Sequence, residues 1–173
     1  SESWLRKNVA RIRPEYLPAD PVGTLTHLPG REIQCDLTFA AGGLPDANGV
    51  HRPLPVLVMA ASHSRFAAAC LLPTRRTDDL IAGMWQLIER DFKAVPDRLG
   101  WDREAGIGKA RLCEPVAAFA GAIGTKIVQA PPRDPESKGI VERTNGYMKR
   151  SFFPGRHFSN PQDVQDQLDE WFS

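Results

Sequence analysis

The spacing of apolar residues in this chain changes once, near Thr77, and that change limits the folds available to it. Before it, three segments have the composition of strands: 32–39, 55–61 and 66–72. In the first, Ile33, Cys35 and Leu37 alternate with polar residues, as in a strand with one buried face. The link at 40–53 contains Gly-Gly and Asn-Gly turn signals and is expected to be a loop. The three segments therefore predict an antiparallel meander.

Helices alternate with short strands after that point. Leu80, Met84, Ile88 and Phe92 repeat at four-residue spacing, and Thr77 is the expected N-cap of their helix. The elements expected next are a strand at 99–101, a helix at 115–122, a strand at 126–129, a helix at 137–152 and a helix opened by Asn160-Pro161. This order predicts an α/β fold whose five-stranded mixed sheet, three antiparallel strands and then two parallel ones, is flanked by helices.

Cysteine content and hydropathy argue against a structural zinc site and a membrane-spanning segment, and the charge is unevenly distributed. The formal net charge is only +1, but residues 121–160 hold seven Lys or Arg against three acids, and residues 161–173 hold four acids and no base. Three widely spaced cysteines without a CxxC pair argue against a structural zinc site and fit a reducing cytoplasm. The chain shows neither a signal peptide nor an apolar run of membrane-spanning length.

Three acidic residues occupy positions where active sites form. Asp36 lies on the polar face of the first strand, Asp102 follows the fourth strand, and Glu142 lies in the helix after the fifth. Strand ends and the adjoining helix converge on one crevice in such sheets. Each residue also has a simpler interpretation: a solvent-facing strand residue, a turn residue, and a helix-surface acid paired with Lys138.

Three motifs resemble those of retroviral integrases and related bacterial transposases. Residues 135–145, Pro-Glu-Ser-Lys-Gly-Ile-Val-Glu-Arg-Thr-Asn, resemble the third motif, in which a Glu follows a Lys/Gln-Gly-x-x pattern and an Asn comes three residues later. Residues 31–38 resemble the first motif around Asp36, and residues 99–106 the second around Asp102. The chain looks most like IstA-type insertion-sequence transposases, over residues 32–152.

This resemblance implies a ribonuclease H-like fold and a DDE-type polynucleotidyl transferase that cleaves transposon DNA ends and transfers them into target DNA. It implies Asp36, Asp102 and Glu142 as catalytic residues and metal ligands. Many relatives have Asp-Asn-Gly in the second motif, whereas Arg103-Glu104 follows Asp102 here. Asp97 and Glu104 therefore remain alternatives for the second acid.

The expected chemistry is an in-line displacement at phosphorus. Two divalent ions stabilise the attacking and leaving oxygens of such a reaction. Because Mg²⁺ prefers oxygen ligands and retains several waters, three carboxylates suffice to hold two Mg²⁺ ions, with Mn²⁺ as a substitute. The implied partners are DNA, further copies of the chain when DNA is bound, and the AAA+ helper ATPase of IstA-type transposases. A cytoplasmic, nucleoid-associated bacterial location follows.

The helix around Glu142 carries the residues expected to bind DNA. Lys138, Asn145 and Lys149 share one face with Glu142, which is suited to contacts with the DNA backbone. Arg143 and Arg150 extend this basic patch. A solvated helix face with one ion pair is the alternative. For the whole chain, the alternatives are a ribonuclease H-like nuclease and a non-catalytic DNA-binding or assembly module of the same fold.

The expected domain organisation has three parts. Residues 1–30, with a short basic helix at 4–13 and then several prolines, form a lead-in or linker. Residues 31–158 form the integrase-type catalytic core, and residues 159–173 are a helix that begins a following region. Its apolar stripe of Val164, Leu168, Trp171 and Phe172 is expected to pack on that region or on a second protomer. The chain is interpreted as a fragment that binds DNA weakly by itself.

Overall fold

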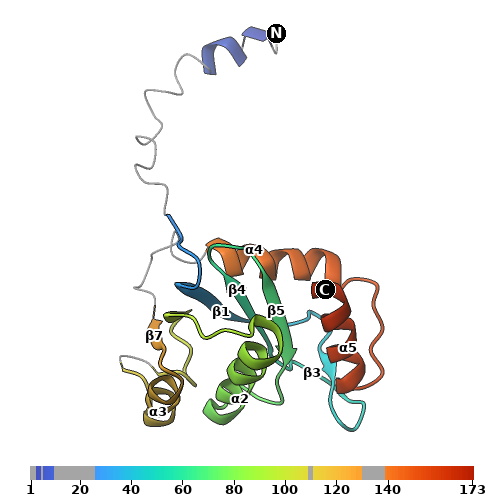
Figure 1. The fold of residues 1–173 in the computed structure, drawn as a ribbon. Helices are drawn as coiled ribbons and strands as arrows, with labels where there is room; N and C mark the ends of the chain where they lie inside the picture. Colours follow the sequence, from blue (N-terminus) through green and yellow to red (C-terminus); the bar gives the residue numbers. More distant parts are fainter. Residues whose placement is uncertain (1–2, 5, 10–25, 109–110, 130–138) are drawn as a thin grey trace.

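A five-stranded mixed sheet forms the centre of the computed structural model, which describes residues 3–4, 6–9, 26–108, 111–129 and 139–173 (Figure 1). The strand order is β5-β4-β1-β6-β7. The strands are β1 (Glu32–Thr38), β4 (Val56–Ala61), β5 (Ala67–Leu71), β6 (Arg98–Trp101) and β7 (Lys126–Gln129). β4 runs antiparallel to β1 and β5, whereas β6 runs parallel to β1 and β7. The sheet predicted from the sequence is confirmed.

A small hairpin interrupts the segment that was expected to be a loop. It consists of β2 (Leu44–Pro45) and β3 (His51–Arg52). The Asp46 carboxylate accepts hydrogen bonds from Arg52 Nε at 2.6 Å and from two backbone N–H groups of the turn, those of Asn48 and Val50. These donors, the Arg52 side chain most of all, hold the pKa of Asp46 below its usual value. Two-residue strands are too short to show a period in the sequence.

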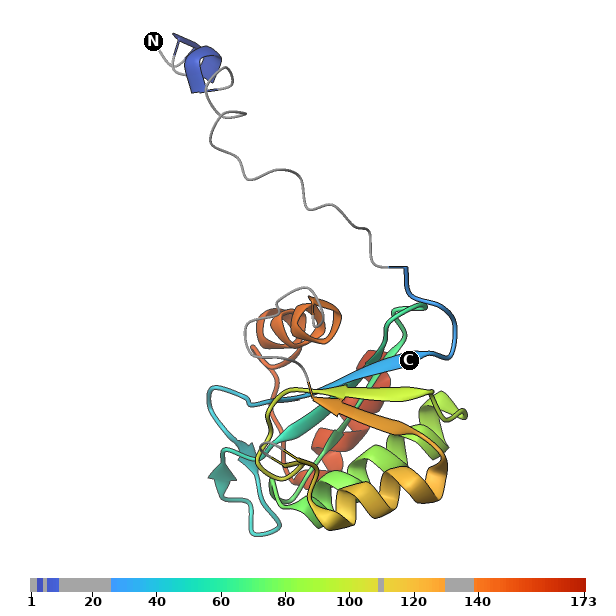
Figure 2. The same ribbon diagram turned by 90° about the vertical axis from the view of Figure 1, so that its left-hand side faces the viewer.

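Helices cover both faces of the sheet (Figure 2). On one face lie α2 (Thr77–Leu87), continued by the π-helical turn η1 (Ile88–Phe92), and α3 (Glu114–Ile123). On the other lie α4 (Gly139–Tyr147), continued by the π-helical turn η2 (Met148–Phe152), and α5 (Pro161–Phe172). Within the described part of the chain, none of the helices has the length and hydropathy needed to cross a bilayer.

Two of the expected helix starts can be checked. Asn160 is the N-cap of α5, as predicted, because its Oδ1 accepts from the backbone N–H of Asp163 at 3.0 Å. For α2 the expectation is wrong: Arg76 is the N-cap and Thr77 is the first helical residue. The Thr77 hydroxyl instead donates to the Gly106 carbonyl at 2.8 Å. Its side chain therefore ties α2 to the loop after β6.

The alternation of β1 separates two cores. Ile33 and Cys35 are buried against α2 and α3 in the larger apolar cluster. Gln34, Asp36 and Thr38 occupy the alternate positions, so they face the layer that contains α4. Polar side chains of β1 thus lie between the sheet and a helix, where each polar group needs a hydrogen-bond partner.

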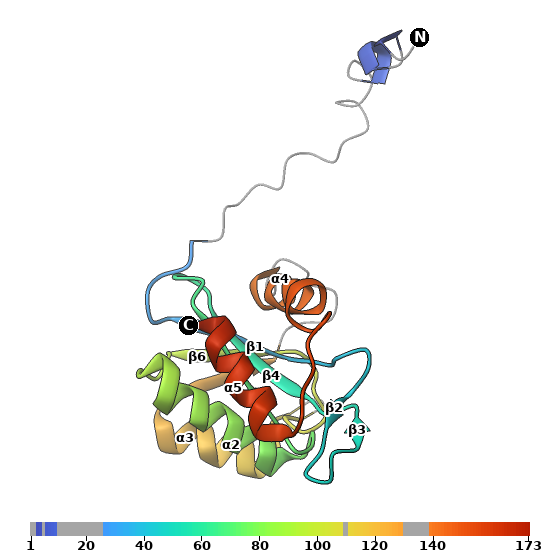
Figure 3. The same cartoon turned by 90° about the vertical axis from the view of Figure 1, so that its right-hand side faces the viewer.

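Helix α5 belongs to the second layer of this domain (Figure 3). Val164 and Leu168 are fully buried in the smaller apolar cluster, together with Met148 and Phe152. Trp171 packs against Phe152 with ring centroids 5.6 Å apart. The expectation that this apolar stripe serves an external partner is therefore wrong for its buried members. The sequence shows that the helix is amphipathic, but it does not show which surface the apolar side packs against.

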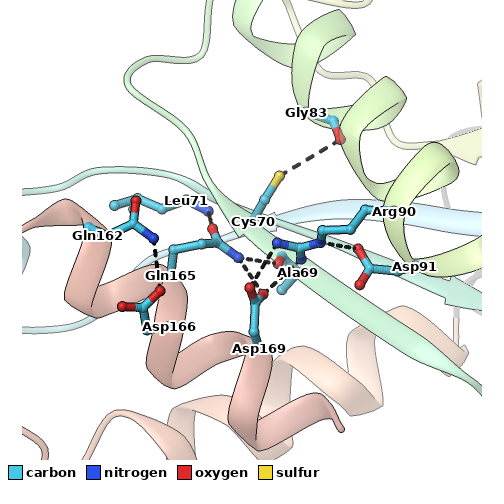
Figure 4. A network of polar contacts seen from close by, with 10 residues as sticks. All are labelled: Ala69, Cys70, Leu71, Gly83, Arg90, Asp91, Gln162, Gln165, Asp166 and Asp169. Carbon is cyan, nitrogen blue, oxygen red and sulfur yellow. Dashed lines mark hydrogen bonds and ion pairs between the residues drawn. The ribbon is translucent and has the colours of Figure 1, made fainter.

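A polar network fixes α5 to the edge of the sheet (Figure 4). Gln165 accepts from the Leu71 N–H at 2.9 Å and donates to the Ala69 carbonyl at 3.1 Å, so it satisfies backbone groups of edge strand β5. Asp169 accepts two hydrogen bonds from the Arg90 guanidinium, at 2.7 and 2.8 Å. A bidentate pair of this kind is geometrically specific as well as charged. The network therefore fixes the register of α5 on β5 and η1.

Truncating a buried α5 side chain tests whether the helix is part of the folded domain. Leu168→Ala is expected to lower the free energy of unfolding by about 2–5 kcal/mol, because it leaves a cavity in the smaller cluster. The exposed neighbour Glu170→Ala is the control and should stay within about 0.5 kcal/mol of the wild type. Urea denaturation followed by circular dichroism measures both. Equal stabilities would mean that α5 does not contribute to the core.

Candidate active site

Two aspartates lie beside one another toward the carboxyl ends of adjacent parallel strands: Asp36 within β1 and Asp102 directly after β6. Cys35 of β1 pairs with Trp101 of β6, and the next residues along the two strands are Asp36 and Asp102. Neighbouring strands are about 4.8 Å apart, so the two aspartates extend from neighbouring backbone positions. Asp36 is half-buried and Asp102 is exposed. The register thus places the two acids beside each other toward one edge of the sheet.

Helix α4 is docked on the polar face of β1 by two hydrogen bonds. The Val141 backbone N–H donates to Gln34 Oε1 at 3.2 Å, and Asn145 Nδ2 donates to Asp36 Oδ2 at 2.7 Å. The other carboxylate oxygen of Asp36 accepts from the Leu37 N–H at 2.9 Å. Two donors from different elements thus fix the orientation of this carboxylate.

Glu142 lies on α4 between these two anchoring residues. A helix turns about 100° per residue, so Glu142 projects about 60° from Asn145 around the helix axis. Its side chain is exposed, at the rim of the helix face that contacts β1. The docking of α4 therefore holds Glu142 on the same side of the sheet as Asp36.

Asn145 has a structural role that the sequence did not indicate. It was expected to contact the DNA backbone, but only 6% of its surface is exposed, and it donates to Asp36. Its Oδ1 atom is buried and meets no hydrogen-bond donor among the described residues. A buried oxygen without a partner is costly and is often explained by an ion or water at the site. Its spacing of three from Glu142 is the only signal in the sequence for this position.

The two alternative acids have different surroundings. Asp97 precedes β6, so it lies at the opposite end of that strand from Asp102, about 16 Å away at about 3.3 Å per residue. It pairs with Arg31 at 3.0 Å. Glu104 pairs with Arg75 at 2.7 Å. Asp102 is the one of the three that directly follows the strand paired with β1.

The donor set at this edge fits a hard divalent cation. Among the described residues, no group of three or more Asp, Glu, His or Cys side chains comes close enough together to hold a metal ion. Asp36 and Asp102 nevertheless lie on neighbouring strands, and Asn145, whose Oδ1 meets no donor within the described part of the chain, contacts Asp36. Mg²⁺ needs only one or two carboxylates when substrate oxygens and water complete its shell.

The basic residues expected at the DNA surface lie on two sides of α4 and η2. Lys149 is seven residues after Glu142, so the two share one side, and both are exposed. Arg143 and Arg150 project away from the sheet, about 80–100° around the helix axis from Glu142. Lys138 lies outside the described residues. The single basic patch expected from the sequence is therefore divided.

A cationic pocket extends from Lys149 along the surface. It encloses about 630 Å³ between the loop after β1 and the loop after η2. Its basic and imidazole side chains are Lys149, Arg156, His51 and His157, and its aromatic rings are Phe39, Phe153 and Phe158. No acidic residue is among the described residues that line it. The pocket suits an anionic ligand with planar groups.

The comparisons with known proteins agree with this architecture. Residues 123–173 match the family model of the integrase core domain. Within an intasome of simian T-cell lymphotropic virus bound to PP2A regulatory subunit B56 gamma, a chain superposes with a TM-score of 0.65 at 18% identity, covering 88% of this chain and 52% of that one. This chain therefore spans about half the length of that relative.

Two isolated catalytic cores match over most of their length. The BIV integrase catalytic core domain has a TM-score of 0.59 at 16% identity, with 80% of this chain and 81% of that chain covered. The dimeric HTLV-2 integrase catalytic core domain, in complex with magnesium, has a TM-score of 0.60 at 16% identity, with 84% and 85% covered. No curated protein matches the sequence. The chain thus has the ribonuclease H-like fold of integrase catalytic cores.

The contact between Asn145 and Asp36 should contribute to stability, whereas Glu142 should not. Asn145→Ala removes the hydrogen bond that joins α4 to β1, so the free energy of unfolding should fall by about 1–3 kcal/mol. Glu142→Gln, an exposed change on the same helix, should alter it by less than about 0.5 kcal/mol. Chemical denaturation of both variants provides the measurement. A larger loss for Glu142→Gln than for Asn145→Ala would contradict this description of the site.

Proposed function

We propose that this chain is the catalytic core of a DDE-type polynucleotidyl transferase, a transposase that cleaves transposon DNA ends and transfers them into target DNA. The observation that carries the proposal is the placement of Asp36 and Asp102 at adjacent strand ends, with Glu142 on the helix docked beside them. The integrase-type fold and the family match over residues 123–173 support it.

The carboxylates serve as metal ligands in this proposal. Divalent ions held there, Mg²⁺ or Mn²⁺, would stabilise the charge on the attacking and leaving oxygens of an in-line displacement at phosphorus. Asp36, Asp102 and Glu142 would supply the carboxylates that hold these ions. Asn145 keeps the Asp36 carboxylate in one orientation, so this ligand is already ordered before ions bind.

Asp102 is the best supported second acid. Asp97 is at the wrong end of β6, and its carboxylate pairs with Arg31. Glu104 is committed to Arg75, a contact that links the loop after β6 to the segment before α2. Asp102 instead continues the register that brings β6 beside Asp36. These placements support the Asp36, Asp102 and Glu142 set over either alternative.

DNA is expected to approach along the cationic pocket that begins at Lys149. Phosphate contacts supply most of the affinity of proteins for DNA. Lys149 lies two helical turns from Glu142, so a backbone phosphate held there would continue a strand whose reacting phosphate lies at the carboxylates. Lys138, outside the described residues, would extend the same side of α4.

The proposed partners follow from the fold and from the motif resemblance. The related cores occur in a dimeric form and in an intasome, which supports a homo-oligomer assembled on DNA for this chain. The resemblance to IstA-type transposases adds an AAA+ helper ATPase and a bacterial, nucleoid-associated setting. A ribonuclease H-like nuclease would use the same carboxylates, so joining of DNA ends to a target is the property that separates the two enzymes.

Substitutions of the acids test the assignment directly. Asp36→Asn, Asp102→Asn and Glu142→Gln should each reduce metal-dependent cleavage and joining of short duplexes by more than about 10³-fold, because each removes a ligand worth several kcal/mol in the transition state. Asp97→Asn and Glu104→Gln are the matched controls and should retain activity within about ten-fold. If Asp102→Asn kept normal activity and one of the controls lost it, the residue changed in that control would be the second acid.

Removal of the charge on Lys149 tests the DNA path. Lys149→Gln should weaken binding to duplexes of unrelated sequence by the same factor and lower the salt slope by about one, because a phosphate contact carries no base information. Lys126→Gln, an exposed change at the amino end of β7 and so at the edge of the sheet away from Asp36 and Asp102, should change neither quantity. Fluorescence anisotropy over a range of salt concentrations measures both. A loss confined to one DNA sequence would show base recognition instead.

A further inference from the structure

The outer side of α4 and η2 forms a second basic surface, separate from the candidate active site. Arg143, Tyr147 and Arg150 follow one another at spacings of four and three, so they share one helix face. All three are exposed, whereas Asn145, which reaches Asp36, lies on the buried side of the helix. Neither the carboxylates nor Lys149 line this surface.

This face forms one wall of an open groove of about 630 Å³. The turn between β4 and β5 and the end of α5 form the other walls. The lining residues are Arg65, Phe66, Ala67, Arg143, Thr144, Tyr147, Arg150, Trp171 and Phe172. Three arginines and four aromatic rings therefore meet in one groove, and no acidic residue is among its described lining.

No described acidic residue forms an ion pair with the arginines of the groove, Arg65, Arg143 and Arg150. Arg65 has a φ of 66°, in the left-handed region that is costly for a residue with a Cβ atom. The Arg150 guanidinium rests against Gly146, with one nitrogen 3.3 Å from where a Cβ would be. The groove thus presents three cations to an external anion.

Two exposed rings in the groove are held in place by other rings. Phe66 is 43% exposed and packs edge-on against Phe92, with centroids 5.2 Å apart. Tyr147 is 54% exposed and lies against Trp171 at 5.1 Å, with an angle of 34° between the rings. Exposed rings that are already oriented lose little conformational freedom when a flat ligand stacks on them. They are suited to receive planar groups.

We infer that this groove binds a single-stranded segment of DNA, with phosphates against the arginines and bases stacked on Phe66 and Tyr147. Arginines along a groove with interspersed aromatic rings are the combination that binds single strands without sequence preference. A duplex keeps its base faces stacked inside the helix, so it would leave both rings unused. An acidic peptide would satisfy the arginines but would not account for the exposed rings.

In addition to the carboxylate site, the core would thus have a second nucleic-acid contact, on the outer side of the helix that carries Glu142. Unpaired DNA is the class of ligand expected beside an enzyme that separates one DNA segment from another. The groove and the carboxylates lie on adjacent sides of α4, about 80–100° apart around the helix axis.

The test uses the 173-residue chain and a fluorescein-labelled oligothymidylate of about 16 nucleotides, within the range of site sizes for single-strand binders. Phe66→Leu with Tyr147→Leu removes the flat rings while retaining apolar side chains. Arg143→Gln with Arg150→Gln removes two charges from the groove. Arg111→Gln with Lys126→Gln removes two exposed charges near β7, the opposite edge of the sheet from β5. Circular dichroism establishes that each variant is folded.

Each groove double variant should weaken oligothymidylate binding by about ten-fold or more, as expected for lost stacking or lost phosphate contacts. The control double variant should bind within about two-fold of the wild type. The inference is overturned if the ring substitutions leave binding unchanged, or if polyglutamate competes as well as unlabelled oligothymidylate. Glu142→Gln should bind the oligonucleotide normally. Oligothymidylate binding and catalysis are measured separately. The proposed function can therefore fail while this inference stands, and the reverse.

Discussion

The hydrogen bond between Asn145 and Asp36 is the contact on which the proposed site depends. Strand β1 has an apolar face buried by α2 and α3 and a polar face buried by α4. Covering polar side chains with a helix is costly where their hydrogen-bonding groups are left unsatisfied. Asn145 and Gln34 form two hydrogen bonds between α4 and β1, and these bonds fix where α4 lies. The position of Glu142 relative to Asp36 follows from this docking.

The sequence predicts the sheet well because each strand carries a local signal. The alternation in β1, the four-residue spacing in α2 and the Asn160 cap of α5 are properties of neighbouring residues, and all three appear as expected. The β2–β3 hairpin was missed because its strands are two residues long. Thr77 was misassigned because a good N-cap residue found a partner in Gly106, 29 residues away. Contacts between distant segments leave no local pattern.

The candidate site shows the same limit. The acids were found through motif resemblance, and the register of β1 and β6 brings Asp36 and Asp102 together. Helical spacing placed Asn145 and Lys149 on one face with Glu142, but it did not distinguish a residue buried against β1 from one exposed beside the site. The same spacing places Arg143 and Arg150 about 80–100° from Glu142 around the helix axis, away from that face. Burial depends on what packs against the helix, so only the tertiary structure resolves it.

The proposed function depends most on Asp36 and Asp102 jointly holding divalent ions on an integrase-type core. Anomalous X-ray diffraction from crystals of this chain soaked in Mn²⁺ tests it most directly, since Mn²⁺ accepts the same oxygen ligands as Mg²⁺ and can be located by its own signal. The account predicts a peak within about 2.3 Å of carboxylate oxygens from both aspartates. In crystals of Asp36→Asn that peak should be absent. Saturating Mn²⁺ that binds elsewhere, or at neither aspartate, would contradict the claim.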